Sequence, residues 1–139
     1  MHLFLTIITL GIFWQPSLDY MYKHATTPQK ISQCLWYFNR IKDKTEADEY
    51  KSPEHFILDK GGDCDDYAVI AYVLLKRIGY DPTIMKLHNP YDDRDYGHAI
   101  CIVNENLLFS NDKLIKISLI EYMVKNNWNI CIKTDIRGE

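Results

Sequence analysis

The sequence lacks several patterns that would assign it to familiar classes of protein. No run of lysine or arginine occurs and the formal net charge is -3, so nothing indicates a nucleic-acid-binding surface. There is no Cys-x-x-Cys pair, which argues against a zinc site, and the 4 cysteines lack the spacing of a disulfide-stapled mini-protein. Repeats and linkers are absent as well, so we expect residues 1–139 to form a single domain.

No apolar run is long enough to cross a membrane. The run at residues 3–14 is shorter than the roughly 20 residues that a membrane-spanning helix needs. No Lys or Arg precedes it and no signal-peptidase-like site follows it, so we interpret residues 1–25 as an apolar terminal segment docked on the core. Export or membrane association through this segment is the alternative.

Three of the cysteines, Cys34, Cys101 and Cys131, lie among apolar neighbours. Free cysteine packs as a small hydrophobic residue, so we expect all three to be buried thiols. Unpaired thiols favour a reducing compartment, and the cytoplasm is the expected location.

The fourth cysteine lies in a chemically distinctive stretch, Gly-Gly-Asp-Cys-Asp-Asp-Tyr-Ala, at residues 61–68. Asp63 is a good helix N-cap, and Asp66 three positions later can complete a capping box, so a helix is predicted to begin at Cys64. The N-terminus of a helix favours thiolate, the nucleophilic form, although the neighbouring aspartates oppose it. Cys64 is therefore a candidate nucleophile.

The rest of this helix is expected to lie in the core. Residues 68–75 are all apolar or aromatic, and Gly79 is a natural residue to follow the helix end. Ala68 and Ala71 share the helix face of Cys64, and their small side chains would let another element approach closely.

The expected partner is the stretch Tyr-Gly-His-Ala-Ile-Cys-Ile-Val at residues 96–103, which predicts a buried strand led by His98. A thiol on a helix N-terminus and an imidazole at the start of a strand are the two parts of a thiol–imidazole nucleophile. His88, at the end of the preceding predicted strand, is the alternative histidine.

Together these motifs resemble the transglutaminase-like cysteine proteinase superfamily, and most closely its small bacterial and phage-type members. The similarity covers roughly residues 28–115 and includes Lys-Ser-Pro-Glu-His-Phe at residues 51–56. It implies an α+β fold with a papain-like core, in which a buried helix carrying the cysteine packs on a small antiparallel sheet. It also implies a Cys-His-Asp or Cys-His-Asn triad.

The order of predicted elements fits an α+β domain. Charged residues 42–49 read as a solvated loop, and the polar residues 89–95 read as a loop at the rim of the site. The expected helices start at Pro28 and Cys64 and span 117–126, and the expected strands span 83–87, 98–103, 107–110 and 128–133.

The third member of the triad is open among Ser110, Asn111 and Asp112, at the end of the third predicted strand. In the related periplasmic proteinases this point reads Leu-Asp-Asn, and strict alignment sets Ser110 where they have aspartate. A two-residue turn before this strand would bring Asn111 to the face of His98, whereas a three-residue turn would pair His98 with Asp112. We favour Asn111, with Asp112 and Ser110 as alternatives.

The acids that flank the cysteine allow two readings. Helix capping suffices for Asp63 and Asp66. Close carboxylates can also bind calcium, and the related adhesin-cleaving proteinases use flanking acids in this way, so the resemblance implies Asp63 and Asp65 as calcium ligands. The thiol chemistry itself requires no cofactor.

The function expected from this resemblance is thiol-dependent hydrolysis or acyl transfer at an amide bond of a peptide or protein substrate, by a monomer. Hydrolysis is the favoured outcome, and a transglutaminase or acyltransferase with an amine acceptor is the alternative. A catalytically inactive binding module on the same fold is the hypothesis of a different class, since the third position departs from the family. A calcium-dependent binding protein is a further one.

Overall fold

The computed structural model describes residues 14–41, 50–91 and 97–136. Residues 3–13 of the apolar segment, the predicted loop at 42–49 and most of the predicted rim loop at 89–95 lie outside the described residues. Within the described part of the chain, no helix is both long and apolar enough to cross a membrane.

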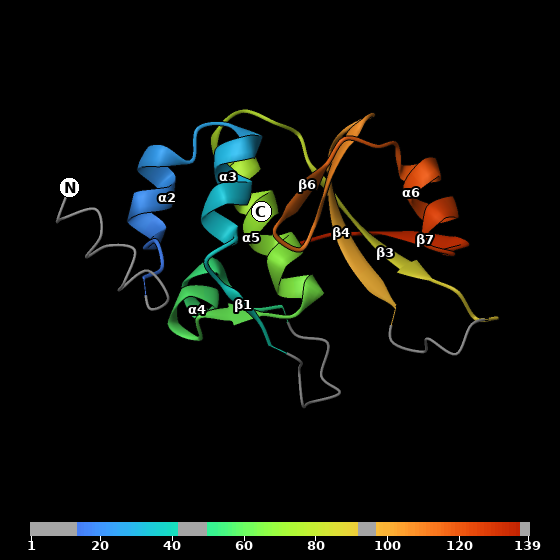
Figure 1. Cartoon of the computed structure of the whole chain (residues 1–139), viewed down its shortest axis with the longest axis horizontal. Helices are drawn as coiled ribbons and strands as arrows, with labels where there is room; N and C mark the ends of the chain where they lie inside the picture. Colours follow the sequence, from blue (N-terminus) through green and yellow to red (C-terminus); the bar gives the residue numbers. More distant parts are fainter. Residues whose placement is uncertain (1–13, 42–49, 92–96, 137–139) are drawn as a thin grey trace, which may run out of the picture.

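The elements form a mixed helical and antiparallel fold, as predicted (Figure 1). The helices are α2 (Leu18–His24), α3 (Pro28–Leu35), α4 (Pro53–Leu58), α5 (Cys64–Arg77) and α6 (Leu119–Lys125). The strands are β1 (Asn39–Arg40), β2 (Gly61–Gly62), β3 (Thr83–His88), β4 (His98–Asn104), β5 (Leu107–Ser110), β6 (Lys113–Ile115) and β7 (Ile130–Thr134). Helix α2 and the short strands β1, β2 and β6 are not in the sequence prediction.

Local capping explains where the helices begin. Each of the five helices in the described residues starts after a residue whose side chain accepts a backbone N–H of the first turn, which would otherwise lack a partner. These N-caps are Ser17, Thr27, Ser52, Asp63 and Ser118. The predicted starts at Pro28 and Cys64 are therefore confirmed.

Five strands form an antiparallel sheet in the order β6-β5-β4-β3-β7. Alternate residues of the central strand β4 enter different cores: Ala99 and Cys101 join the core around α5, while Ile100 packs with Tyr122 of α6. The sheet thus lies between α5 on one face and α6 on the other, with α2, α3 and α4 gathered around α5 (Figure 1).

The pairing of β4 with β5 changes register along its length. Asn104 pairs with Leu107 across a two-residue turn, but Ile102 pairs with Leu108, so Val103 is an extra residue in β4. Beyond this bulge the strands follow the register that a three-residue turn would have given. Alternation from Leu108 then brings Ser110, rather than Asn111, to the face that carries Ile102.

The edge of the sheet corrects one prediction. Cys34 and Cys101 are buried as expected, but Cys131 is exposed, so its predicted burial is wrong. Cys131 lies on β7, which among the described strands pairs with β3 alone and so forms an edge of the sheet, and its apolar neighbours Ile130 and Ile132 are exposed as well. An apolar run predicts a strand here, but it does not tell whether the strand lies inside the sheet or at its edge.

Candidate functional site

Cys64 is the first residue of α5, and its position is fixed by a complete capping box. The Asp63 carboxylate accepts the N–H of Asp66 at 3.2 Å, and the Asp66 carboxylate accepts the N–H of Asp63 at 3.0 Å. Two backbone donors at the helix N-terminus are thereby satisfied. The thiol is half-buried at the end of a helix whose other residues fill the core.

Asp66 also connects the helix to the segment before it. Its side chain is fully buried and accepts the N–H of Lys51 at 2.8 Å as well as that of Asp63. A Cβ at Gly62 would lie 2.5 Å from the Cβ of Asp66, so a glycine is required where the chain passes this carboxylate. Asp66 is thus a structural residue that ties the segments at Lys51 and Asp63 to the start of α5, next to Cys64.

The two glycines before Cys64 form a short parallel pairing with β1. Gly61 pairs with Asn39 and Gly62 with Arg40. Gly61 has a φ of 145°, and a Cβ there would collide with the backbone carbonyl of Asn39. The pairing brings the Arg40 guanidinium close enough to act on the thiol of Cys64.

The environment of the thiol raises its pKa overall. Burial is the largest cause of the raised pKa of Cys64, and the negative charges of Asp65 and Asp63 add to it, while a hydrogen bond with the Ala99 backbone and the charge of Arg40 oppose it. The resting site therefore favours the thiol, although the helix N-terminus alone predicts the opposite direction. The thiol therefore lies near the backbone of Ala99, the residue that follows His98.

His98 begins β4, and its ring is held by a short chain of hydroxyl groups. Its Nε2 lies 2.9 Å from Ser110 Oγ, which in turn lies 3.0 Å from Tyr122 Oη. Two aromatic rings face the imidazole: Trp128 with centroids 6.1 Å apart and planes at 14°, and Tyr122 at 6.5 Å and 27°. Sequence reasoning missed Tyr122 and Trp128, because no local pattern tells which α6-side residues reach this strand.

The turn into β4 depends on a glycine. Gly97 has a φ of 65°, and a Cβ there would lie 2.9 Å from both the His88 ring and the carbonyl oxygen of Leu87. His88 therefore packs against the backbone just before His98. His88, the alternative histidine, thus has a packing role beside the residue that precedes β4.

The other two candidates for the third residue lie just past β5. Asn111 has a φ of 55°, and its buried Oδ1 has no hydrogen-bond partner among the described residues. The backbone carbonyl of Asp112 accepts a hydrogen bond from Ser32 Oγ at 2.6 Å. Of the three candidates, Ser110 is the one with a described hydrogen bond to His98, and the catalytic role of each remains a prediction.

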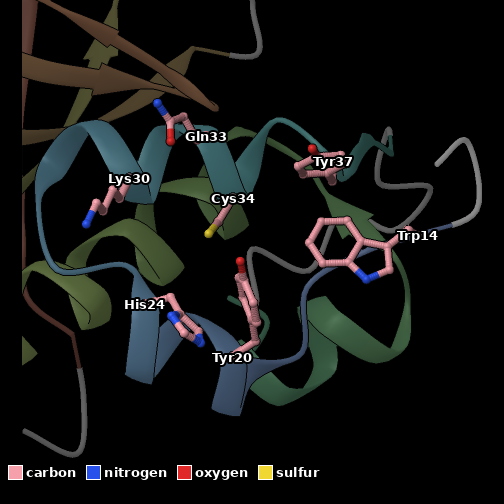
Figure 2. A pocket seen from close by; sticks show the side chains of 7 residues that line it. All are labelled: Trp14, Tyr20, His24, Lys30, Gln33, Cys34 and Tyr37. Carbon is pink, nitrogen blue, oxygen red and sulfur yellow. The ribbon is translucent and has the colours of Figure 1, made fainter. Parts of the chain in front are cut away.

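A separate pocket of about 360 Å³ lies between α2 and α3 and shares no lining residue with the site just described (Figure 2). In it the Trp14 ring meets Tyr20 and Tyr37 edge-on, at centroid distances of 5.7 and 4.7 Å. The lining residues are Trp14, Tyr20, His24, Lys30, Gln33, Cys34 and Tyr37. None of the residues predicted for the thiol chemistry lines it.

The fold resembles solved structures of Legionella pneumophila LapG. The calcium-bound form matches with a TM-score of 0.64 and 19% identity, over 96% of this chain and 84% of LapG. A second LapG structure matches with a TM-score of 0.56 and 20% identity, over 94% of this chain and 72% of that one. No curated protein sequence matches this chain. At these identities the likeness establishes the fold.

The sequence resemblance predicted Asp63 and Asp65 as calcium ligands, and both carboxylates have other contacts in the structure. Asp63 Oδ1 is engaged in the helix cap, and Asp65 Oδ1 lies 3.7 Å from the Lys86 ammonium. Calcium takes six to eight oxygen ligands, whereas the described ranges contain no group of three or more His, Cys, Asp or Glu side chains able to hold a metal. The described residues on their own do not fit a calcium ion.

A family model supports the same conclusion as the fold. The model of the transglutaminase-like domain matches residues 5–136, which is nearly the whole sequence and includes both motifs. The resemblance recognised from the cysteine and histidine motifs is thus confirmed, and the chain belongs to the transglutaminase-like domain family.

Proposed function

We propose that this protein is a cysteine hydrolase that cleaves an amide bond in a peptide or protein substrate, with Cys64 as nucleophile and His98 as general base and acid. The single observation that supports this most is the position of Cys64. Its thiol lies at the start of a buried helix, and the backbone of Ala99, next to His98, is close enough to act on the pKa of the thiol. Membership of the transglutaminase-like family adds to it.

The proposed reaction has two steps. His98 takes the thiol proton, the sulfur attacks the carbonyl carbon, and a C–S bond forms as the C–N bond breaks. The departing amine takes its proton from the imidazolium, which leaves a thioester on Cys64. His98 then accepts a proton from water, which attacks the thioester to release the acid and restore the thiol. An amine in place of water would give acyl transfer.

The raised pKa of Cys64 bears on how the nucleophile forms. Since burial and the adjacent aspartates favour the thiol, the proton has to pass to His98 for attack to occur near neutral pH. Because Nε2 of His98 contacts Ser110, we assign the proton exchange with Cys64 to the other ring nitrogen, Nδ1. For the third residue, this contact favours Ser110 over the sequence preference for Asn111.

The alternative of a different class is a transglutaminase-like binding module without catalysis. Its support is the serine at the position where the family has an aspartate. A module of that kind needs no activated thiol, so the reactivity of Cys64 separates the two functions.

The test is thiol labelling followed by intact-protein and peptide mass spectrometry. Cys131 is exposed and would react with any probe, so every variant is made in a Cys131→Ser background. A peptidyl vinyl sulfone or iodoacetamide at pH 7 should then label Cys64. Cys64→Ser should abolish labelling and hydrolysis with little loss of stability, and His98→Ala should slow alkylation about tenfold or more.

The matched control is His88→Ala, which removes an imidazole close to the same backbone turn. It should leave the alkylation rate unchanged. Alkylation of Cys64 that is no faster than that of an unfolded reference and is unaffected by His98→Ala would support the binding module. A loss seen in His88→Ala but not in His98→Ala would transfer the base role to His88.

A further inference from the structure

The pocket between α2 and α3 brings together side chains that the proposed thiol chemistry does not use (Figure 2). Its volume of about 360 Å³ lies in the range of small-molecule sites, which is roughly 300–1,000 Å³. Tyr20 and His24 are four positions apart on α2. Lys30 and Cys34 are four positions apart on α3. Residues at this spacing share one face of a helix, so each helix turns one face toward the pocket.

Three aromatic rings line the pocket and remain well exposed. Trp14 and Tyr20 are each 41% exposed, and Tyr37 is 37% exposed. Trp14 meets the two tyrosine rings edge-on, with its plane at 90° to Tyr20 and at 89° to Tyr37. Aromatic rings attract one another in this geometry, so the three rings hold each other in place. An exposed aromatic cluster around a cavity is typical of a binding site.

A hydrogen bond between distant segments fixes the shape of this cluster. Gln15, which follows Trp14, donates from its Nε2 to the backbone carbonyl of Tyr37 at 3.1 Å. The segment before α2 is thereby tied to the segment after α3. A pocket that is already formed loses less conformational freedom when a ligand binds, so less of the binding energy is lost in ordering it.

The polar groups of the pocket favour a negatively charged ligand. Lys30 supplies an ammonium, and His24 and Gln33 can donate hydrogen bonds from a ring nitrogen and an amide nitrogen. No aspartate or glutamate is among the lining residues that the structure describes. An anion in the pocket would therefore meet donors and a positive charge without facing a carboxylate from the lining.

The ammonium of Lys30 is available for such a ligand. Across residues 14–41, 50–91 and 97–136, no ion pair joins it to a carboxylate. Asp19, the acid beside Tyr20 on α2, does not line the pocket. A bond between an ammonium and a carboxylate or phosphate is about twice as strong as a neutral hydrogen bond, so this group can decide which ligands bind.

We propose that the pocket between α2 and α3 binds a small ligand that carries an aromatic ring and one negatively charged group, a carboxylate or a phosphate. The ring of the ligand packs against Trp14, Tyr20 and Tyr37, and its anionic group accepts a hydrogen bond from Lys30 Nζ. This binding is independent of hydrolysis, because the pocket shares no lining residue with the site around Cys64.

The experiment is a titration of the full-length protein, labelled with nitrogen-15, by matched phenyl compounds. Phenylacetate and phenyl phosphate carry a negative charge, phenylacetamide has the same ring without a charge, and phenethylamine carries a positive charge. NMR follows the backbone amides and the indole Nε1–H of Trp14, which is assigned by its loss in Trp14→Phe. We expect a Kd of roughly 1 mM for phenylacetate, the affinity of a ligand of this size, and binding of the amide and the amine at least about tenfold weaker. Comparison of the two anions tells whether the pocket prefers a carboxylate or a phosphate.

Two lysine variants test the source of this preference. Lys30→Met removes the ammonium but keeps an unbranched side chain, and it should weaken the binding of phenylacetate about five- to tenfold, the effect of one charged hydrogen bond. Lys23→Met is the matched control, because it removes a lysine of α2 that does not line the pocket, and it should leave the Kd unchanged. Circular dichroism checks that both variants are folded.

Four results would overturn the proposal. One is the absence of any shift at the lining residues at about 10 mM phenylacetate and phenyl phosphate. The second is equal binding of the anionic, neutral and cationic compounds, and the third is an equal Kd in Lys30→Met and Lys23→Met. The last is a set of shifts around Cys64 in place of those around Trp14. A protein without hydrolase activity that still binds phenylacetate through Lys30 would sustain this site while refuting the proposed hydrolysis.

Discussion

Replacing Asp66 should destabilise the protein more than any other change among the aspartates beside Cys64. Its carboxylate is fully buried and accepts the N–H groups of Lys51 and Asp63 at 2.8 and 3.0 Å. Asp66→Ala would leave both donors without a partner beside the helix N-terminus. Water cannot replace the carboxylate without entering the core.

The magnitude follows from the number and kind of bonds lost. A hydrogen bond to a charged group contributes about 1.5–3 kcal/mol, and the two bonds share one desolvated carboxylate, so we expect Asp66→Ala to cost about 3 kcal/mol. Asp66→Asn keeps one acceptor oxygen but turns an amide donor toward the other N–H, so it should cost about 2 kcal/mol. In a chain of this length, a loss of 3 kcal/mol corresponds to roughly 10 °C in Tm.

Urea denaturation followed by circular dichroism measures this free energy of unfolding. Asp65→Asn is the matched control: its side chain is partly exposed (18%), unlike that of Asp66, and its carboxylate lies 3.7 Å from the Lys86 ammonium, so the loss of its charge should cost no more than about 1 kcal/mol. An unchanged m-value would show that the denatured state is the same in all variants. If Asp66→Ala cost less than Asp65→Asn, the reasoning from the capping box would be refuted.

Three further predictions follow from burial and charge. Ala71→Leu should cost about 1–3 kcal/mol, because Ala71 is fully buried in the core that α5 shares with the sheet; a variant as stable as the wild type in urea would contradict this packing. Burial raises the pKa of the Cys101 thiol, so its contribution to stability is complete below the unfolded value of about 8.5 and is lost as the pH rises toward the folded value. Unfolding free energy should fall above pH ~8.5 by up to about 1.4 kcal/mol per pH unit for this group, and a Cys101→Ala curve with the same slope would exclude it as the cause. Since the Lys86 ammonium already lies beside Asp65, exchanging EGTA for calcium should move Tm by less than about 1 °C; a larger increase would indicate a calcium site.

Much of the candidate site could be predicted because its signals are local. The start of α5 at Cys64 follows from Asp63 and Asp66, three positions apart, and from the apolar run behind them. The strand at His98 follows from its own apolar residues. Neither prediction depends on a distant part of the chain, and both hold in the structure.

The third position behind His98 could not be predicted in this way. Each of the two turn lengths considered from the sequence describes one part of the β4–β5 pair. The turn itself has two residues, after Asn104, but beyond Val103 the strands follow the register expected for a three-residue turn. A one-residue bulge moves every side chain after it to the opposite face of the sheet relative to the partner strand, and no local sequence pattern predicts such a bulge. The contact between Ser110 and His98 depends on that one residue.

The sequence by itself determined the helix that presents Cys64 and the strand that begins with His98, because caps and apolar patterns act over a few neighbouring residues. The motifs around these two residues also carried the resemblance to the family. Only the tertiary structure decided the register of β5, the approach of Tyr122 and Trp128 to His98 from the far side of the sheet, and the exposure of Cys131 at its edge. These depend on which elements lie side by side, and that is settled by packing between segments far apart in the chain.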